Sequence, residues 1–282
     1  MKIITTIKAM RRAVDVWRQQ GRSVGFVPTM GYFHDGHISL MKASVKDNDR
    51  TVVSLFVNPT QFGPQEDLLQ YPRDIARDKL AARSAGVDVL FVPVTDEMYP
   101  QMKTLTWVEV EGIGDILCGA SRPGHFRGVA TVVSKLLNIV QPDVMYLGQK
   151  DAQQAALLKK MVSDLNFPVC VKVCPTLREE GGLAMSSRNS YLSASEKTRA
   201  SVIFRALCHA AEMIADGERE VPKINSSIKK LICDGAGASI DYVACIRLDG
   251  FQIARRIEGD TLIAVAVRIG STRLIDNIVV KV

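Results

Sequence analysis

Stretches typical of β-strands and of amphipathic α-helices alternate along the first two thirds of this 282-residue chain. Short apolar runs predict strands at residues 2–6, 23–30, 50–58, 87–93, 144–148 and 168–176. Apolar residues at helical spacing predict helices at residues 7–21, 37–47, 72–86, 128–142 and 151–166. Alternation of this kind favours a parallel sheet with helices on both of its faces. The predicted fold class is therefore α/β, built on a doubly wound parallel sheet.

The apolar spacing also predicts which side chains face the sheet. In the helix at 37–47 we expect Ile38, Met41 and Val45 to point inward. The helix at 128–142 is rich in valine, but its apolar residues keep helical spacing from Val129 to Val140. The continuous apolar run at 50–58 is typical of a strand that is buried on both faces.

The pattern changes near residue 176, where a loop rich in glycine and serine begins. It ends in a predicted capping box formed by Ser193 and Glu196. A long helix at 196–217 and a second helix with Pro222 in its first turn follow. Three strands, at 239–248, 261–269 and 273–282, are separated by turn residues and are expected to be antiparallel. We therefore predict two domains, 1–175 and a smaller α+β domain at 176–282.

Composition limits the possible functions. The net charge is +6, but the basic residues occur as dispersed doublets and not as one cluster. A small anionic ligand therefore explains the positive net charge as well as a nucleic-acid partner does. The six cysteines form no Cys-x-x-Cys pair, which argues against a zinc site. No apolar run is long enough to span a bilayer, and the N-terminus lacks the apolar core of a signal peptide. We expect a cytoplasmic protein without membrane or nucleic-acid partners.

Two of the four histidines, His34 and His37, lie at a predicted helix start directly after the strand at 23–30. Free backbone N–H groups and the helix dipole favour an anion there. Gly31 and Gly36 let the backbone approach a ligand closely, because glycine has no Cβ. Two imidazoles at this point could donate hydrogen bonds to a phosphate that gains charge in a transition state. The alternative is a capped turn with surface histidines.

Polar residues also follow two other predicted strands. Asn58 and Gln61 come after the third strand, and their amides suit hydroxyl or carboxylate groups. Lys150 and Asp151 come after a later strand and could bind a phosphate and a ribose, with Gln154 pointing inward one turn on. The carboxyl ends of parallel strands meet at one edge, so the three motifs should converge on one crevice. Ordinary turns and a capped helix start remain the alternatives.

Two further loops contain possible anion-binding groups. Ser186, Ser187 and Arg188 lie in the glycine-containing loop between the predicted domains, where such groups can wrap phosphates. An interdomain linker is the alternative. The segment from Arg122 to Arg127, which includes His125, is either functional or a basic surface loop. The chain has no Walker A, G-x-G-x-x-G or G-x-S-x-G motif, which argues against kinase and Rossmann dehydrogenase functions.

The paired histidines after an early strand, followed much later by Met-Ser-Ser-Arg, resemble the HIGH and KMSKS signatures of the class I aminoacyl-tRNA synthetase and nucleotidyltransferase superfamily. Within it, five ordered segments at residues 27–37, 54–74, 122–143, 147–154 and 178–189 resemble the pantothenate synthetase (pantoate–β-alanine ligase) family. The resemblance implies a Rossmann-like first domain, the substrates ATP, pantoate and β-alanine, magnesium, and a homodimer. Residues 50–57 and their neighbours are candidates for the dimer surface.

The resemblance also implies roles for individual residues. The implied catalytic residues are His34, His37, Lys150 and Arg188, with His37 as the proton donor. The implied ATP-binding residues are Met30, Gly31, His34, His37, Gly148, Lys150, Asp151, Leu177, Met185, Ser186, Ser187 and Arg188. Gln61 and Gln154 are implied to bind pantoate, with Asn58 nearby, and Gln61 also to meet β-alanine. The metal ligands are not identified.

The implied reaction is the condensation of (R)-pantoate with β-alanine through a pantoyl adenylate, with release of pyrophosphate and AMP. Phe33, Leu147 and Gln149 depart from the residues common in the family, and Tyr32 lies at a variable position. We expect these departures to change affinity and not to abolish activity. The alternatives are another small-molecule nucleotidyltransferase of the superfamily, a nucleic-acid-binding relative and an inactive binding protein.

Overall fold

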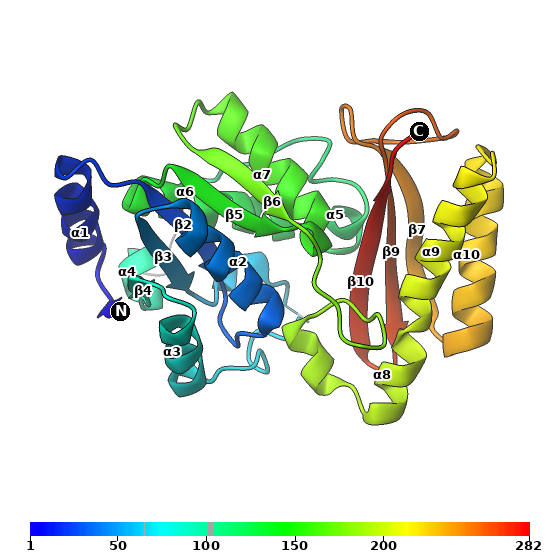
Figure 1. Cartoon of the computed structure of the whole chain (residues 1–282), viewed down its shortest axis with the longest axis horizontal. Helices are drawn as coiled ribbons and strands as arrows, with labels where there is room; N and C mark the ends of the chain where they lie inside the picture. Colours follow the sequence, from blue (N-terminus) through cyan, green and yellow to red (C-terminus); the bar gives the residue numbers. More distant parts are fainter. Residues whose placement is uncertain (65, 101–103) are drawn as a thin grey trace. The chain divides into compact units, whose positions relative to one another are not determined.

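The computed structural model describes residues 1–64, 66–100 and 104–282 (Figure 1). The chain divides into two compact units, Met1–Gly148 with Gln153–Pro175, and Gln149–Ala152 with Thr176–Val282. The main division falls where the sequence predicts its domain boundary. Gln149–Ala152, predicted as part of the first domain, instead group with the second unit, because Asn277 binds backbone carbonyls of this segment.

The first unit is built on a six-stranded sheet with the order β1-β4-β3-β2-β5-β6. Its strands are β1 (Lys2–Ile4), β2 (Val24–Thr29), β3 (Arg50–Leu55), β4 (Val89–Phe91), β5 (Val144–Gly148) and β6 (Cys170–Cys174). All neighbouring pairs are parallel. The predicted α/β class with a parallel sheet is confirmed.

Both faces of this sheet are buried. Side chains alternate along a strand, so Val27 of β2 and Val53 of β3 share one face, while Phe26 and Val52 share the other. All four are inaccessible to solvent. Residues of β2, β3, β4 and β5 on the first face pack in one cluster with Met41. Burial on both sides explains the continuous apolar runs by which the sequence predicts these strands.

Helices cover the sheet in the way that alternation predicts (Figure 1). Helix α2 (Asp35–Asp47) contacts β2, β3 and β5, and α6 (His125–Val140) contacts β2 and also α1 (Ile7–Gln19). Among the described residues, the other helical segments of this unit are η1 (Pro59–Gln61), α3 (Ile75–Ser84), α4 (Thr95–Met98), α5 (Cys118–Ser121) and α7 (Ala152–Asp164). Residues Val129 and Val140 of α6 are buried, as the helical spacing predicts.

Two sequence expectations for the first unit are wrong. Met41 of α2 is buried and Ile38 is half-buried, but Val45 is 37% exposed. Val45 lies beside Gly86, which has no side chain to cover it. Residues 50–57 do not form a free surface, because β3 lies between β2 and β4 and the residues from Thr51 to Ser54 are fully buried.

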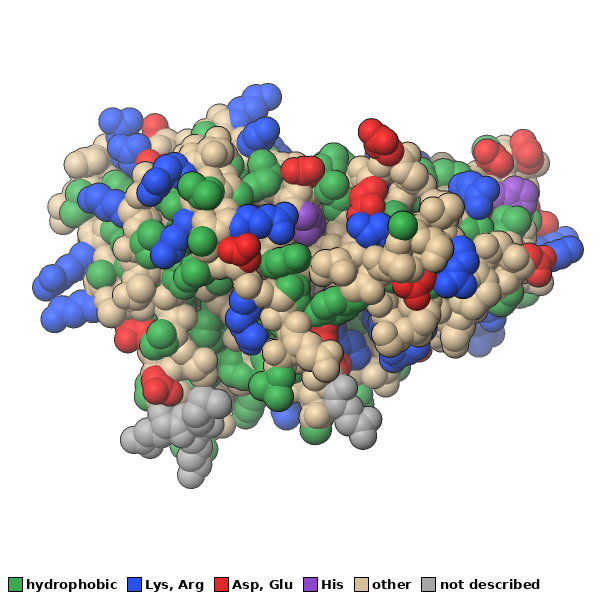
Figure 2. All heavy atoms as spheres, turned by 90° about the horizontal axis from the view of Figure 1, so that it is seen from below, with side chains coloured by type: hydrophobic (Ala, Val, Ile, Leu, Met, Phe, Trp, Pro, Cys, Tyr) green, Lys and Arg blue, Asp and Glu red, His purple; other side chains and the backbone are tan. Residues whose placement is uncertain are grey.

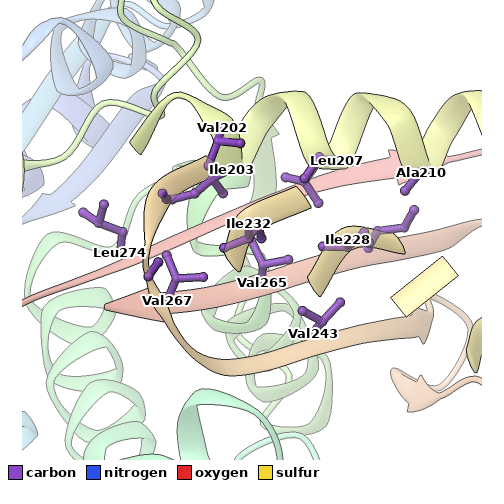
Figure 3. Close-up of a cluster of buried hydrophobic side chains, with 14 of the residues drawn as sticks. Val202, Ile203, Leu207, Ala210, Ile228, Ile232, Val243, Val265, Val267 and Leu274 are labelled. Carbon is purple, nitrogen blue, oxygen red and sulfur yellow. The ribbon is translucent and has the colours of Figure 1, made fainter. Parts of the chain in front are cut away.

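The second unit contains an antiparallel sheet with the order β10-β9-β7-β8. Its elements are α8 (Ala194–Ala200), α9 (Val202–Ala215), α10 (Val221–Ala236), β7 (Ser239–Arg247), β8 (Gln252–Ile253), β9 (Thr261–Ile269) and β10 (Thr272–Val280), after the 3-10 helix η4 (Ser187–Tyr191). Figure 3 shows apolar side chains of α9 and α10 meeting those of the sheet. The predicted smaller α+β part with antiparallel strands is confirmed.

The helix predictions for this unit hold in two places and fail in one. The capping box is present: Glu196 N donates to Ser193 Oγ, and Ser193 N donates to Glu196 Oε2. Pro222 lies in the first turn of α10. The single helix predicted at 196–217 is two helices that meet at Ser201. The Ser201 hydroxyl donates to the carbonyl of Thr198 at 2.7 Å, a local bond that competes with regular helix geometry.

The outer surface agrees with the dispersed charge of the sequence. Figure 2 shows basic side chains scattered over the drawn face, with acidic ones among them. In the part of the chain that the structure describes, no helix has both the length and the apolar character needed to cross a membrane.

Candidate active site

The polar motifs found in the sequence follow three neighbouring strands. β2 lies between β3 and β5 in the sheet, and all three strands run in the same direction. From β2 the chain continues to β3 on one side, and it returns later to β5 on the other side. Ligands of open α/β sheets bind outside the carboxyl ends of the strands at such a point of reversal. The loops after β2 and β3 and the end of β5 at Gly148 are therefore the natural place for a site.

The loop after β2 places both histidines at the start of α2. His34 is the N-cap residue of this helix, and its Nδ1 accepts a hydrogen bond from Gly36 N at 3.2 Å. His37, one turn into the helix, has its Nδ1 3.4 Å from His34 N, which donates to it. The two ring centroids are 4.1 Å apart. The predicted helix start is confirmed, and its two imidazoles lie side by side.

These contacts determine where a neutral imidazole carries its proton. A ring nitrogen that accepts from a backbone N–H has no proton of its own, so the proton sits on the other nitrogen. The hydrogen-bond network thus assigns the Nε2–H tautomer to both His34 and His37. Each ring can then donate one hydrogen bond through Nε2 at a helix start that already favours anions.

A buried aspartate that the sequence analysis did not single out holds the same loop. Asp78 of α3 is 1% exposed, and its two carboxylate oxygens accept from the backbone N–H groups of Tyr32 and Phe33, each at 2.7 Å. Burial raises the pKa of Asp78, although both hydrogen bonds oppose the shift. Tyr32 has a φ of 53°, an uncommon conformation that the two bonds help to hold.

Gly31 has a close neighbour that explains its lack of a side chain. Its φ is 87°, and a Cβ added there would lie 3.0 Å from Asp78 Oδ2. A larger residue would therefore strain the backbone and push against the carboxylate that holds the loop. Met30, the preceding residue, is half-buried, and its sulfur accepts a weak bond from Gln61 Nε2 at 3.1 Å.

The loop after β3 is a 3-10 turn that fixes the amide of Gln61. Asn58 caps the turn and is 1% exposed. Its Nδ2 donates to Gln61 Oε1 at 3.0 Å and to Gly128 O at 3.2 Å, while its Oδ1 accepts from the hydroxyls of Thr60 and Tyr99. With Oε1 bound in this way, Gln61 presents Nε2 as its donor.

His125, in the segment whose role the sequence left open, also binds Gln61. Its Nδ1 lies 2.8 Å from Gln61 O, and its Nε2 lies 2.9 Å from Arg122 Nη1. The guanidinium is a donor only, so Nε2 accepts and Nδ1 carries the proton toward the carbonyl. Arg122 also donates to both carboxylate oxygens of Glu66, at 2.8 and 2.7 Å. The segment is thus a support for Gln61.

The pairing of Glu66 with Arg122 changes the pKa of the Glu66 carboxyl group. Burial raises the pKa of Glu66, but the hydrogen bond and the positive charge of Arg122 outweigh it, and the net pKa is lowered. Arg122 therefore forms an ion pair with Glu66 of the same chain.

The predicted phosphate-binding residues after β5 belong to the second unit. Lys150 and Asp151 lie in the 3-10 helix η3 (Gln149–Asp151), and Lys150 Nζ is 3.8 Å from Asp151 Oδ1. Lys150 is 18% exposed. Gln149 Nε2 donates to Asn277 Oδ1 at 3.1 Å. In this chain, Gln149 therefore has a defined partner in β10.

The loop at 176–189, also in the second unit, folds back on itself. Met185 N donates to Leu177 O at 3.0 Å, and Glu179 N donates to Leu183 O at 2.8 Å. Ser186 then caps η4, where its Oγ accepts from Arg188 N at 3.3 Å. Loop residues thus form a short hairpin that leads directly into the Ser-Ser-Arg motif, which argues against a plain linker.

The remaining predicted residues have varied surroundings. Gln154 of α7 is half-buried, whereas its neighbour Gln153 is buried and binds backbone groups of residues 113–118. Gly148 ends β5, and a Cβ there would meet nothing within 4 Å. Leu177 is exposed, while Ser187 is buried. Phe33 and Leu147, two residues that depart from the family pattern, are buried in the core.

Among the described residues, no group of three or more His, Cys, Asp or Glu side chains could hold a metal ion. These residues therefore do not fit a metal site made by the protein alone. Magnesium in nucleotide enzymes usually keeps several waters and is held largely by substrate phosphates.

Comparisons with known proteins cover nearly the whole chain. The family model of pantoate-beta-alanine ligase matches residues 2–279. The pantothenate synthetase of Moorella thermoacetica is 51% identical over 282 residues, which are 100% of this chain and 99% of that protein. The crystal structure of pantothenate synthetase from Thermus thermophilus shares 42% identity, with a TM-score of 0.93 and 99% of each chain covered.

A further solved structure contains ligands. The pantoate-beta-alanine ligase from Francisella tularensis, in complex with beta-gamma ATP and beta-alanine, is 37% identical, with a TM-score of 0.80 and coverage of 99% of this chain and 97% of that chain. Identity at this level over the full length, together with the match of the family model, shows that the chain is an enzyme that belongs to the pantoate-beta-alanine ligase family.

Proposed function

We propose that the chain joins (R)-pantoate to β-alanine at the expense of ATP and so forms pantothenate. In the first step a pantoate carboxylate oxygen attacks the α-phosphorus, and the bond to the β-phosphate breaks, which releases pyrophosphate. In the second step the β-alanine amine attacks the carbonyl carbon of the pantoyl adenylate, the bond to AMP breaks, and the amine loses a proton. Neither step needs a covalent nucleophile of the protein.

The paired histidines carry this proposal. In the first step negative charge grows on the phosphates, and preorganised donors aimed at that charge stabilise the transition state. His34 and His37 each accept a backbone hydrogen bond at Nδ1, which orients both rings at the helix start and makes Nε2 their donor atom. His37 serves as the proton donor, and Met30 and Gly31 line the ATP site. The clamp of Asp78 on the same loop supports this role, because catalytic donors must be held rigidly.

Gln61 binds pantoate and then β-alanine in this proposal, together with Gln154 for pantoate. The Nε2 group of Gln61 contacts only a thioether sulfur, Met30 Sδ, among the partners that the structure gives it, and sulfur is a weak acceptor. A substrate oxygen is a better acceptor and would replace it. Asn58, whose amide already binds groups of four other residues, acts near pantoate indirectly, by orienting Gln61.

The proposed ATP-binding residues also include residues of the second unit. Lys150 supplies a point charge, and Arg188 a fork of donors, to the phosphates. Ser186 and Ser187 add hydroxyl and backbone donors beside Arg188. The other proposed contacts with the nucleotide are those of Gly148, Asp151, Leu177 and Met185, with Gly148 and Asp151 at the ribose.

Magnesium enters this proposal as the counter-ion of ATP, since the described residues offer no cluster of their own for it. The use of ATP supports a place of action in the cytoplasm. A homodimer is also part of the proposal, on the basis of the family resemblance, with a surface other than β3.

The test is a pair of assays on the purified chain. With ATP, magnesium and pantoate, we expect exchange of labelled pyrophosphate into ATP that depends on pantoate. Addition of β-alanine should then release one AMP for each pantothenate formed. Exchange without pantoate would reject the ligase function. Pyrophosphate release that never yields AMP would favour the alternative, a small-molecule nucleotidyltransferase of the same superfamily.

A further inference from the structure

Two consecutive polar residues, Asp276 and Asn277, interrupt the apolar strand β10, and each is only 4% exposed. Neighbouring residues of a strand point to opposite faces, so the two side chains leave β10 in different directions. A buried polar side chain without hydrogen-bond partners would cost roughly 1–3 kcal/mol. The hydrogen-bond partners of these two side chains therefore indicate why polar residues occupy these positions of β10.

Asn277 binds the segment that carries Lys150. Its Nδ2 donates to Gln149 O at 3.0 Å and to Lys150 O at 2.9 Å. Its Oδ1 accepts from Gln149 Nε2 at 3.1 Å. Both amide hydrogens and the amide oxygen are thus used on two adjacent residues of η3. A 3-10 turn of three residues has little hydrogen bonding of its own, so these bonds from Asn277 help to hold it in place.

Asp276 binds the loop that leads to Ser186 and Arg188. Its carboxylate accepts from Arg178 Nη1 at 2.6 Å and from Nη2 at 3.0 Å, a bidentate pair. Arg178 also donates to Gly182 O at 3.1 Å, and its guanidinium lies 3.7 Å from the ring centroid of Phe204. The guanidinium is therefore held between the strand and the turn of the hairpin at 177–185.

We propose that Asp276 and Asn277 are positioning residues that set the places of the phosphate-binding groups in the second unit. Asn277 fixes the backbone of Lys150, and Asp276 fixes, through Arg178, the hairpin that ends at Ser186. The inference rests on the proposed function, in which Lys150 and Arg188 bind ATP phosphates. It adds that two neighbouring residues of one strand, far from either group in the chain, hold both.

The position of a cation relative to the phosphates determines how much it contributes to the rate. A cation stabilises charge on a phosphate only when it lies at hydrogen-bond distance, and a displacement of about 1 Å can cost about 100-fold in rate. Lys150 sits on a flexible stem, so the direction of its side chain depends on where the backbone of η3 is held. Pantoate does not depend on these anchors, because its proposed ligands Gln61 and Gln154 belong to the first unit.

The main test is Asn277→Asp, which keeps the shape but turns two donors into an acceptor that faces two carbonyl oxygens. In the pantoate-dependent exchange assay we expect kcat/KM for ATP to fall about 10- to 100-fold. The KM for pantoate should stay within about twofold of the parent value, because Gln61 is untouched. The matched control is Asp241→Asn, which breaks the pair with Arg273 in the same sheet. It should leave both constants unchanged.

A second variant, Arg178→Lys, keeps the charge beside Asp276 but loses the bidentate geometry. We expect the same selective loss toward ATP. The positioning role is overturned if a folded variant of either kind keeps the parent constants for ATP, or if ATP and pantoate are affected equally. Loss of the fold in both variants would also overturn it, since the pair would then hold the unit together instead. A parent chain without pantoate-dependent exchange would reject the proposed function itself.

Discussion

The carboxylate of Asp78 accepts hydrogen bonds from the backbone N–H groups of both Tyr32 and Phe33, at 2.7 Å each. The bonds cross from helix α3 to the loop that ends at His34. Since Tyr32 has a positive φ and Phe33 directly precedes the first histidine, the aspartate sets the path by which the backbone enters α2. Asp78 thus helps to set where the backbone that carries both histidines lies.

Replacement of Asp78 by Asn should therefore weaken both stability and catalysis. One of the two backbone donors would face an amide NH₂ and lose its acceptor, which costs about 1.5–3 kcal/mol for a bond to a charged group. We expect a lower free energy of unfolding and an exchange rate reduced roughly tenfold or more. Urea unfolding and the exchange assay measure these. Asp74→Asn, which alters the cap of the same helix, is the control and should spare the rate.

The histidines themselves should show their effect in the adenylation step. His37→Ala removes one Nε2 donor, and the loss of one such donor typically costs about 10²–10³ in rate. We expect pyrophosphate exchange to slow by at least two orders of magnitude, while circular dichroism shows an intact fold. His34→Ala should slow the step and also cost about 1 kcal/mol of stability, because His34 is the N-cap of α2. A loss below fivefold for His37→Ala would mark that histidine as structural.

The sequence alone predicts the elements whose signals are local. Buried strands and amphipathic helices leave a periodic trace within a few residues, so the parallel sheet, the antiparallel sheet and the capping box at Ser193 were predictable. The break at Ser201 was not, because the local hydroxyl bond found there leaves no trace in the apolar pattern. The exposure of Val45 also depends on a distant neighbour, Gly86, and not on the helix pattern.

The candidate site divides in the same way. The histidines, Lys150 and the Ser-Ser-Arg motif stand out as residue types at suggestive positions. The residues that hold these groups in place do not stand out in the sequence, because Asp78 lies 46 residues from Tyr32 and Asn277 lies 127 residues from Lys150. An aspartate within a charged helix and an asparagine within a strand look ordinary in one dimension. Only the three-dimensional hydrogen bonds distinguish them, and the same holds for His125 and Gln61.

His125 should prove to be a support for Gln61 and not a surface histidine. His125→Ala removes the donor to Gln61 O and frees the 3-10 turn that fixes the amide. We expect the KM for pantoate to rise roughly tenfold, with the KM for ATP nearly unchanged, in steady-state assays of AMP release. The matched control is Arg127→Ala in the same helix. Arg127 is exposed and stacks on Trp107, so its loss should change neither constant. Equal effects of the two variants would contradict the assigned support.

The last prediction concerns alkaline pH. Burial, followed by the hydrogen bond to Asp47, raises the pKa of Tyr146 to about 12. In an unfolded chain the pKa of tyrosine is about 10, so between about pH 10 and 12 Tyr146 ionises in the unfolded chain and not in the folded one. This ionisation stabilises the unfolded state relative to the folded state. The free energy of unfolding should therefore stay constant below about pH 10 and fall as the pH rises toward 12.

Tyr146→Phe removes this ionisation along with the bonds to Asp47 and Asn48. In urea unfolding at stepped pH, the variant should be less stable than the parent at pH 7 and approach it at alkaline pH. Parallel pH curves for the parent and Tyr146→Phe would refute this, and Tyr191→Phe, at a phenol that is 40% exposed, should follow the parent throughout.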